Sequence, residues 1–262
     1  GVGAAYNAFT SKDHTGYYIK IASEHVPMAA DILEDMLFHS KFEEKELERE
    51  RTVVIEEIHM YEDNPMMFVD ELLEGEVFRG STLGWRISGS QDHIAKMNRA
   101  AMLRFREDYY VPREMVVALA GKYTDEHVRQ VEKYFGKPFP WKSRGRKPYA
   151  KFSIAKGGYA APRVKLHYKE TNQVQCAFGF PSYGMGTRET DALSMLSVIL
   201  GGTMSSRLFI QVRERSGLAY SVRSSQQPVE DVGIFSIQAG LDRGRLHEAI
   251  KVILGEVKKV RD

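Results

Sequence analysis

The sequence contains very little cysteine and no long hydrophobic run. Its 262 residues include one cysteine, Cys176, so neither an internal disulfide nor a zinc site built from several cysteines can form within the chain. We therefore expect a reducing, cytoplasmic location. No apolar stretch reaches the roughly 18 residues of a membrane span, and the first residues lack the basic and apolar regions of a signal peptide. No membrane association is expected.

The sequence also lacks a large excess of positive or negative charge. The 37 Lys and Arg nearly balance the 35 Asp and Glu, so the net charge of +2 gives no indication of nucleic-acid binding. Several catalytic motifs are absent too: no serine stands in G-x-S-x-G, and the eight histidines never form H-E-x-x-H or H-x-x-E-H. With 43% hydrophobic and 27% charged residues, the composition is typical of a globular protein with a substantial core.

Two periodicities alternate along the chain and predict a mixed helix-and-strand protein. Tyr17, Ile19 and Ile21 recur at every second position, as in a half-buried strand, and Ile32 and Met36 recur at helical spacing. The ranges expected as strands are 4–10, 16–22, 115–120, 164–169, 175–179, 217–220 and 233–239. The ranges expected as helices are 26–38, 43–62, 67–78, 99–110, 124–135, 189–200, 207–215 and 245–260.

The organisation of the chain indicates two domains. The sequence 137–148 is basic, punctuated by proline and without periodicity, so we expect a linker at 141–158 between a first domain at 1–140 and a second at 159–262. A long surface loop is the alternative. The order strand, polar link, strand and helix occurs at 3–38 and again at 217–260, which indicates an internal repeat. Because each copy lacks flanking elements that the other has, we expect this chain to be the middle of a longer protein.

The expected helix 43–62 carries two carboxylates on its apolar side. With about 100 degrees per residue, Glu57 falls about 20 degrees from Glu50, and both fall in the centre of an apolar stripe that includes Val54 and Ile58, so we expect them to be buried. A buried carboxylate is costly unless it is paired, protonated or bound to a metal. Two interpretations stay open at this point: a chemical site, or a structural helix in which a glutamate pairs with a basic group such as Arg51 or the stripe is only partly buried.

A second candidate combines an arginine-rich helix, a glycine turn and a strand that bears a tyrosine. Arg213 and Tyr220 can together donate hydrogen bonds to a carbonyl oxygen that becomes negative during acyl transfer. The structural alternative is a set of solvated arginines beside a core tyrosine.

Three segments resemble the family of pitrilysin, insulin-degrading enzyme and mitochondrial processing peptidase. They are Tyr6-Asn7-Ala8-Phe9-Thr10-Ser11-Lys12, the helix from Glu50 to Ile58, and the run Leu200 to Phe209 followed by Arg213 to Tyr220. The resemblance is greatest to the short, two-domain bacterial members. It implies an α+β fold of two related domains, each a mainly antiparallel sheet with helices packed on one face. It also implies a zinc metalloendopeptidase that hydrolyses extended peptides in a chamber between the domains.

The same resemblance assigns roles to individual residues. Glu57 matches the distal ligand of a single zinc ion, and Glu50 matches an accessory carboxylate that supports the site. Arg213 and Tyr220 match the pair that orients the scissile carbonyl and stabilises the oxyanion. The edge strand that receives an extended peptide or unfolded protein would be formed by Ala5, Asn7, Ala8, Phe9 and Thr10.

One departure from the family pattern is large. In the family, H-x-x-E-H supplies the remaining zinc ligands and the general base, and this sequence does not contain it. We expect most ligands to lie outside this chain, and the chain itself to be inactive. The alternative is a non-catalytic homologue that serves as a peptide-binding or assembly subunit of a heterodimeric peptidase; an interaction domain without chemistry is a third option. Homodimer and heterodimer both stay open.

Overall fold

The computed structural model describes most of the chain, and its residues cluster into two compact units. The described residues are 1–137, 151–152 and 161–261. One unit comprises Gly1–Glu56 with Ser90–Tyr149, and the other comprises Glu57–Gly89 with Ala150–Asp262.

This clustering is not linear along the chain. Residues 57–89 belong to the second unit, although they precede part of the first. The division into domains 1–140 and 159–262 stays a prediction. The expected linker 141–158 lies outside the described residues, apart from Lys151 and Phe152.

The first unit contains an antiparallel hairpin, as the alternation of its residues predicted. Strand β1 (Ala5–Thr10) pairs with β2 (Thr15–Lys20), and Ala5 lies opposite Lys20 in the register. Among the described residues no strand pairs with the other edge of β1. That edge therefore presents backbone donors and acceptors that another extended chain can use.

Helices complete the first unit, and their boundaries follow from local signals. Pro27 stands in the first turn of its helix, where a missing N–H is harmless. Thr124 accepts a hydrogen bond from the backbone N–H of His127 and so caps another helix. These two helices, α1 and α6, pack together, with the rings of Phe38 and Phe135 edge-on at a centroid distance of 6.1 Å. The helices are α1 (Val26–Phe38), the first part of α2 (Glu44–Asp63), α4 (Gln91–Lys96), α5 (Arg99–Tyr109) and α6 (Asp125–Phe135), of which the short α4 was not predicted.

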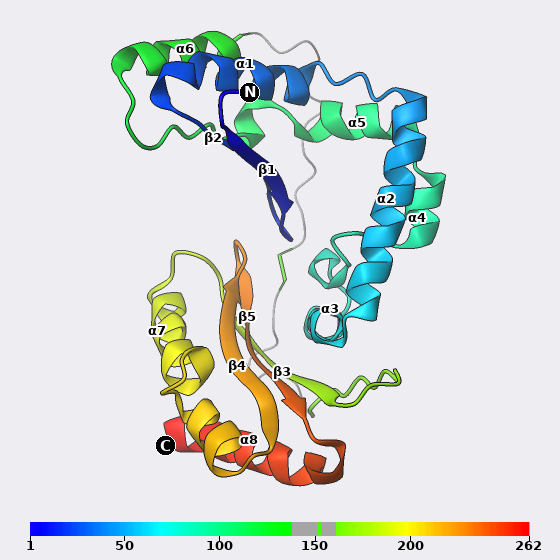
Figure 1. Ribbon diagram of the computed structural model, residues 1–262, viewed down its shortest axis with the longest axis vertical. Helices are drawn as coiled ribbons and strands as arrows, with labels where there is room; N and C mark the ends of the chain where they lie inside the picture. The colour runs from blue at the N-terminus through cyan, green and yellow to red at the C-terminus, as the bar shows by residue number, and fades with distance from the viewer. Residues whose placement is uncertain (138–150, 153–160, 262) are drawn as a thin grey trace. The chain divides into compact units, whose positions relative to one another are not determined.

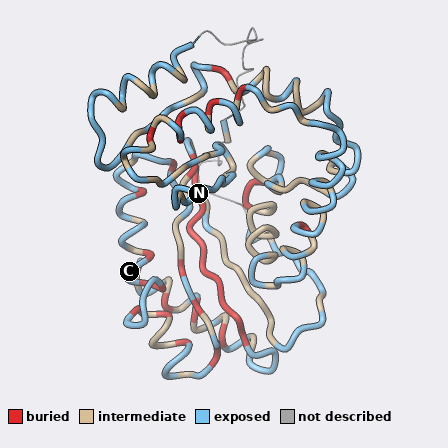
Figure 2. The backbone as a smooth tube through the Cα atoms, turned by 45° about the horizontal axis from the view of Figure 1, so that its top comes forward, coloured by how far each residue is buried: buried red, intermediate tan, exposed pale blue. Residues whose placement is uncertain are grey.

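The second unit is built on a three-stranded antiparallel sheet. Its strands are β3 (Val174–Tyr183), β4 (Ala219–Pro228) and β5 (Val232–Leu241), in the order β3-β5-β4. Every residue of the central strand β5 is buried, and Figure 2 shows buried backbone running through the middle of this sheet. A strand buried on both faces needs a cover on both faces.

A layer of helices covers one face of this sheet (Figure 1). Leu208, Val212 and Ile253 from this layer form a buried core with Ile237 and Leu241 of β5. The expected helices are confirmed, with the difference that two of them contain π-helical turns. The layer consists of α7 (Arg188–Ser197), the π-helix η4 (Val198–Gly202), the π-helix η5 (Phe209–Arg215) and α8 (Leu246–Arg261).

The other cover is α3 (Pro65–Val77), which lies against β3. A Cβ atom placed on Gly179 of β3 would lie 2.8 Å from Leu73 Cδ1 and 2.9 Å from Val77 Cγ2. The side chains of α3 therefore occupy the space that a larger residue would need, and glycine permits the close approach.

Two predicted strands are not strands in the structure. The ranges 115–120 and 164–169 are irregular, and Val116 and Leu166 are 94% and 87% exposed. A β-strand requires a neighbour that accepts its backbone hydrogen bonds, and no described segment pairs with these two. The apolar run at 115–120 and the alternation at 164–169 therefore indicated the wrong state.

The internal repeat is present as a repeated order of elements. In the first unit β1 and β2 are followed by a 3-10 turn (Ser23–His25) and α1, and in the second unit β4 and β5 are followed by a 3-10 turn (Arg243–Arg245) and α8. Among the helices described, none combines the length and apolar character that crossing a membrane requires.

Candidate functional site

The helix α2 (Glu44–Asp63) carries the two glutamates that the sequence singled out. Both Glu50 and Glu57 are exposed, so the prediction that they are buried is wrong. The buried side of α2 is marked by Ile58, with Leu47 and Val54 half-buried. These apolar residues lie about 40 to 80 degrees to one side of Glu50, so the carboxylates stand at the margin of the stripe.

The two carboxylates have no partner among the described residues. Arg51, the expected partner, is engaged elsewhere: it contacts the Glu48 carboxylate and donates to the carbonyl oxygens of Ile94 at 3.1 Å and Met97 at 2.8 Å. No hydrogen bond or ion pair to Glu50 or Glu57 is found in the part of the chain that the structure describes. Both groups are therefore free to bind a cation or a proton donor.

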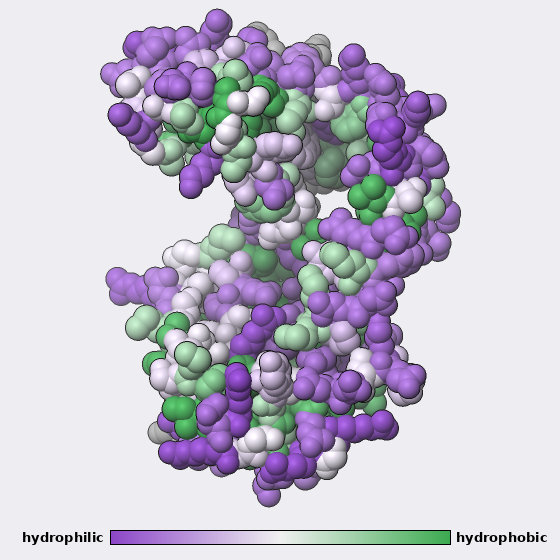
Figure 3. All heavy atoms as spheres, viewed as in Figure 1, coloured by the Kyte–Doolittle hydropathy of each residue, from purple (hydrophilic) through white to green (hydrophobic). Residues whose placement is uncertain are grey.

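The face of α2 near Glu57 also presents apolar side chains. Val53 and Met60 are 54% and 55% exposed, and each lies within about 60 degrees of Glu57 around the helix. Figure 3 shows hydrophilic side chains along α2 with hydrophobic ones among them. Apolar residues beside unpartnered carboxylates are typical of a surface that another element covers.

A cavity of about 480 Å³ reaches Glu50 within the first unit. It lies between the end of α1 and the start of α2, and its wall combines acidic groups with an apolar floor that includes Met36 and Leu47. The residues that line it are Asp35, Met36, His39, Ser40, Lys41, Phe42, Glu43, Glu46, Leu47 and Glu50.

Arg213 and Tyr220 are brought together by a tight turn. The π-helix η5 ends at Arg215, and Gly217, two residues later, adopts a left-handed φ of 56°, which suits glycine. The N–H of Gly217 donates to the carbonyl of Arg213 at 3.1 Å, and the chain then reverses into β4. As a result the guanidinium carbon of Arg213 lies 5.6 Å from the centre of the Tyr220 ring.

A β-bulge aims Tyr220 outward. Ala219 pairs with Leu241 and Ser221 pairs with Gly240, so Tyr220 is the extra residue between two ladder positions. A bulge of this kind re-directs a side chain and is frequent beside active sites. The Tyr220 side chain is 74% exposed, and no hydrogen bond of its hydroxyl is found within the described residues.

The predicted peptide-binding strand is β1. Each of its residues is exposed, and Phe9 packs edge-on against His14 with a centroid distance of 5.7 Å. The amide of Ala8 donates to Asn7 Oδ1 at 2.8 Å. Geometrically, β1 has what strand addition requires, namely an extended backbone with one unpaired edge. The candidate residues on it are Ala5, Asn7, Ala8, Phe9 and Thr10.

The described residues do not make a complete metal site. No cluster of three or more His, Cys, Asp or Glu side chains suited to a metal ion is found among them. A catalytic zinc ion usually takes three protein ligands, so Glu57 fits as one ligand of an incomplete set. Nor does any described hydrogen bond or ion pair join Glu57 to Arg213 or Tyr220.

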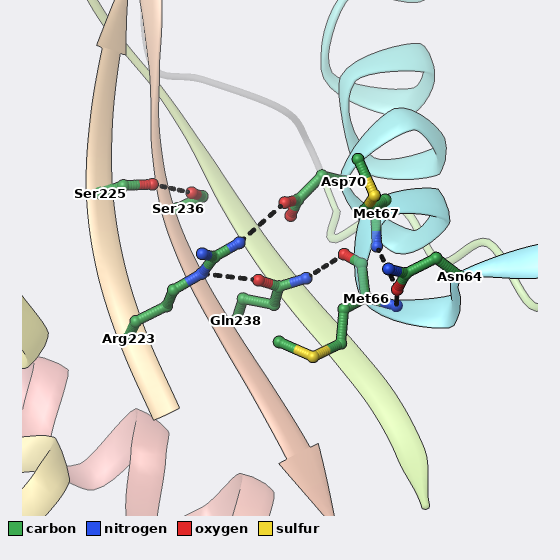
Figure 4. A network of polar contacts seen from close by, with 8 residues as sticks. All are labelled: Asn64, Met66, Met67, Asp70, Arg223, Ser225, Ser236 and Gln238. Carbon is green, nitrogen blue, oxygen red and sulfur yellow. Dashed lines mark hydrogen bonds and ion pairs between the residues drawn. The ribbon is translucent and has the colours of Figure 1, made fainter. Parts of the chain in front are cut away.

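A polar network that the sequence analysis missed holds α3 to the sheet (Figure 4). Arg223 of β4 donates from Nε to Gln238 Oε1 of β5 at 2.7 Å, and Gln238 Nε2 donates to the carbonyl of Met66. Arg223 also reaches Asp70 Oδ2 at 3.4 Å. Burial raises the pKa of Asp70, and the charge of Arg223 opposes that rise.

The sequence of the strands β4 and β5 contains a pattern that could have predicted part of this network. Positions 236 and 238 of β5 carry polar side chains between apolar ones, and the residues that face them on β4, at positions 223 and 225, are polar as well. Such a pattern predicts a polar stripe on one sheet face. It does not reveal that α3 lies on that face.

Two family models match the chain. The model described as Insulinase (Peptidase family M16) matches residues 1–91, and the model described as Peptidase M16 inactive domain matches residues 96–262. The two matches leave only a short interval between them.

Relatives of the chain carry protease names. A Bacillus subtilis (strain 168) protein named uncharacterized zinc protease YmxG is 38% identical over 252 residues, which make up 96% of this chain and 60% of that protein. A Streptomyces coelicolor protein, also named an uncharacterized zinc protease, is 35% identical over 262 residues, or 100% of this chain and 57% of that protein. The chain thus spans about 60% of the length of these relatives.

Solved structures share the fold. A protease from Helicobacter pylori gives a TM-score of 0.83 at 22% identity, over 98% of this chain and 63% of that chain. A peptidase M16 inactive domain from Pseudomonas fluorescens gives a TM-score of 0.79 at 16% identity, over 98% of this chain and 62% of that chain.

Proposed function

Because the chain belongs to the insulinase family of M16 peptidases, we propose that it is part of a zinc metalloendopeptidase that hydrolyses extended peptides. The observation that carries this proposal is the pair of glutamates on α2, which are exposed and without a partner in the described structure. The names of the relatives support zinc as the metal. Since the chain spans about 60% of those relatives, the activity is proposed for the whole protein.

In this proposal Glu57 supplies one zinc ligand. An unpartnered carboxylate binds a divalent cation without first breaking an ion pair, and the exposed apolar residues beside Glu57 suit a second element that brings further ligands. Glu50, two turns earlier, supports the site as a second carboxylate. When bound, zinc supplies a Lewis acid and an activated water. Most of its ligands are proposed to lie outside this chain.

Arg213 and Tyr220 act on the substrate carbonyl. Their side chains lie together and their donor groups are not used by described residues, so both can donate hydrogen bonds to an oxygen that gains negative charge. Donors that are already in place when charge develops lower the barrier, because they need no reorganisation at that moment. The substrate would be a peptide or an unfolded protein segment, since pairing with the open edge of β1 requires an extended chain.

A second candidate function is that of a non-catalytic subunit. The match of residues 96–262 to a family model described as an inactive domain favours it for that part of the chain. Such a subunit would bind peptides or assemble with an active partner, without holding zinc itself. The two candidates differ in one measurable property, the metal content of the whole protein.

The deciding experiment compares zinc retention in the full-length protein and its E57Q variant. After dialysis against metal-free buffer, zinc per chain is measured by mass spectrometry. We expect wild type to retain about one zinc ion and E57Q to lose it, because an amide is a far weaker zinc ligand than a carboxylate. E56Q, a change of the same chemistry one residue earlier, is the control and should keep its metal.

Three results would count against parts of this scheme. Unchanged zinc in E57Q would remove Glu57 from the metal site. Loss of zinc in E56Q as well would mean that any charge change on α2 acts through the fold. A wild-type protein without zinc would favour the non-catalytic subunit. The cytoplasmic location stays a prediction.

A further inference from the structure

We propose that Phe209 is a positioning residue for Arg213, a role that rests on the function proposed above. The guanidinium carbon of Arg213 lies 4.8 Å from the centre of the Phe209 ring and 5.6 Å from that of Tyr220. Both distances are within the roughly 6 Å over which a cation is attracted to an aromatic face. Arg213 is thus held by two aromatic rings.

The fold puts Phe209 and Arg213 side by side for a structural reason. Leu208 and Val212, four residues apart, are both fully buried in the core of the second unit. Phe209 directly follows Leu208, and Arg213 directly follows Val212. Both side chains therefore project from the same side of the π-helix η5. Single π-helical turns are rare and occur frequently at functional sites. The turn at Gly217 then returns the chain so that Tyr220 meets Arg213 as well.

The two aromatic contacts restrain Arg213 without using its hydrogen-bond donors. Nearby arginines are fixed by acceptors: Arg207 by the buried carboxylate of Glu256 at 2.8 Å, and Arg223 by Gln238 at 2.7 Å. Arg213 has no hydrogen bond within the described residues, and its Nε lies 3.8 Å from the Glu214 carboxylate, beyond hydrogen-bond distance.

A guanidinium that lies over aromatic rings keeps its N–H groups available, because neither contact uses a hydrogen-bond donor. Restraining the guanidinium near the two rings also limits the directions in which its planar set of N–H groups can point. Phe209 therefore prepares Arg213 to bind a substrate carbonyl, and lysine could not replace Arg213 in this arrangement.

The test uses the full-length protein with the variants F209L, F209Y and F180L. Leucine keeps an apolar side chain but removes the aromatic face, whereas tyrosine keeps the face. Phe180 of β3 is 38% exposed and does not contact Arg213 in the described structure, so F180L is a matched control. Peptidase activity is measured with an internally quenched peptide, and thermal unfolding is recorded for every variant.

F209L is expected to lower kcat by about two- to fivefold, as the loss of one exposed cation–π contact implies. KM should stay within about twofold, because the interaction matters most where charge develops. F209Y should restore kcat, and F180L should not change it. In an R213K background, F209L should add little further loss, since the group that Phe209 positions is already gone.

A second measurement keeps this inference separate from the proposed function. The chemical shift of the Arg213 Nε–H group, assigned through R213K, reports the aromatic rings that lie over it. We expect F209L to move this resonance and F209Y to retain it. An active enzyme in which F209L has wild-type kcat, or in which F209Y is as impaired as F209L, would overturn the role of Phe209 and leave the peptidase assignment standing. A protein without peptidase activity would overturn that assignment, and the resonance alone would then decide whether Phe209 holds Arg213.

Discussion

Replacing Gln238 by leucine should loosen α3 from the sheet of the second unit. Gln238 is 4% exposed; it accepts from Arg223 Nε at 2.7 Å and donates to the Met66 carbonyl. Of these two bonds only the one to the Met66 carbonyl joins the sheet to α3. A hydrogen bond contributes about 1 kcal/mol net, so Q238L should destabilise the attachment of α3 by about 1 kcal/mol. That corresponds to about a fivefold faster exchange of amide hydrogens that open with α3.

Hydrogen exchange followed by mass spectrometry can measure this change on peptides that cover α3. The matched control is S236A, which removes the hydrogen bond between Ser236 and Ser225 at 2.9 Å on the same sheet face. That bond joins β4 to β5 and does not reach α3, so exchange of the α3 peptides should stay within about twofold of wild type. Wild-type exchange in Q238L, or equal acceleration in S236A, would refute the reasoning.

Two further predictions concern Asp70 and Tyr220. Because burial raises the pKa of Asp70, the folded protein loses stability as Asp70 ionises with rising pH. D70N should therefore slow amide exchange in α3 at pH 7. Below about pH 4, where aspartate is protonated in the unfolded chain as well, D70N should not slow this exchange. Faster exchange in D70N at pH 7 would contradict this sign. Y220F should lower kcat more than it changes KM, by about a hundredfold for one lost oxyanion donor, and a change in KM alone would exclude that role.

Much of the fold could be predicted from the sequence because the signals are local. The α1 boundaries follow from helical spacing and Pro27, and the hairpin β1–β2 follows from alternation on both sides of a polar link. By contrast, the apolar run 115–120 and the alternating range 164–169 also have strand-like sequences and are not strands. A sequence pattern describes one segment, whereas a strand also depends on a partner elsewhere in the chain.

The same distinction between local and distant contacts separates the predictable from the unpredictable parts of the candidate site. The proximity of Arg213 and Tyr220 was predictable, because a single turn at Gly217 joins the elements that carry them. The exposure of Glu50 and Glu57 could not be predicted. A helical wheel gives the direction of each side chain around α2, but it does not show which element packs against that side. The stacking of Phe209 on Arg213 also escaped notice, because an arginine near a phenylalanine in a helix is common and becomes informative only when its other contacts are known.

The turn between η5 and β4 also limits how the chain can vary in length. A residue added or removed between Arg213 and Tyr220 would shift the left-handed position away from Gly217, or would turn the bulged residue of β4 toward the opposite face of the sheet. Most surface turns accept such insertions and deletions. Here the seven-residue spacing itself carries information, so we expect single-residue length changes in this segment to be more damaging than most substitutions within it.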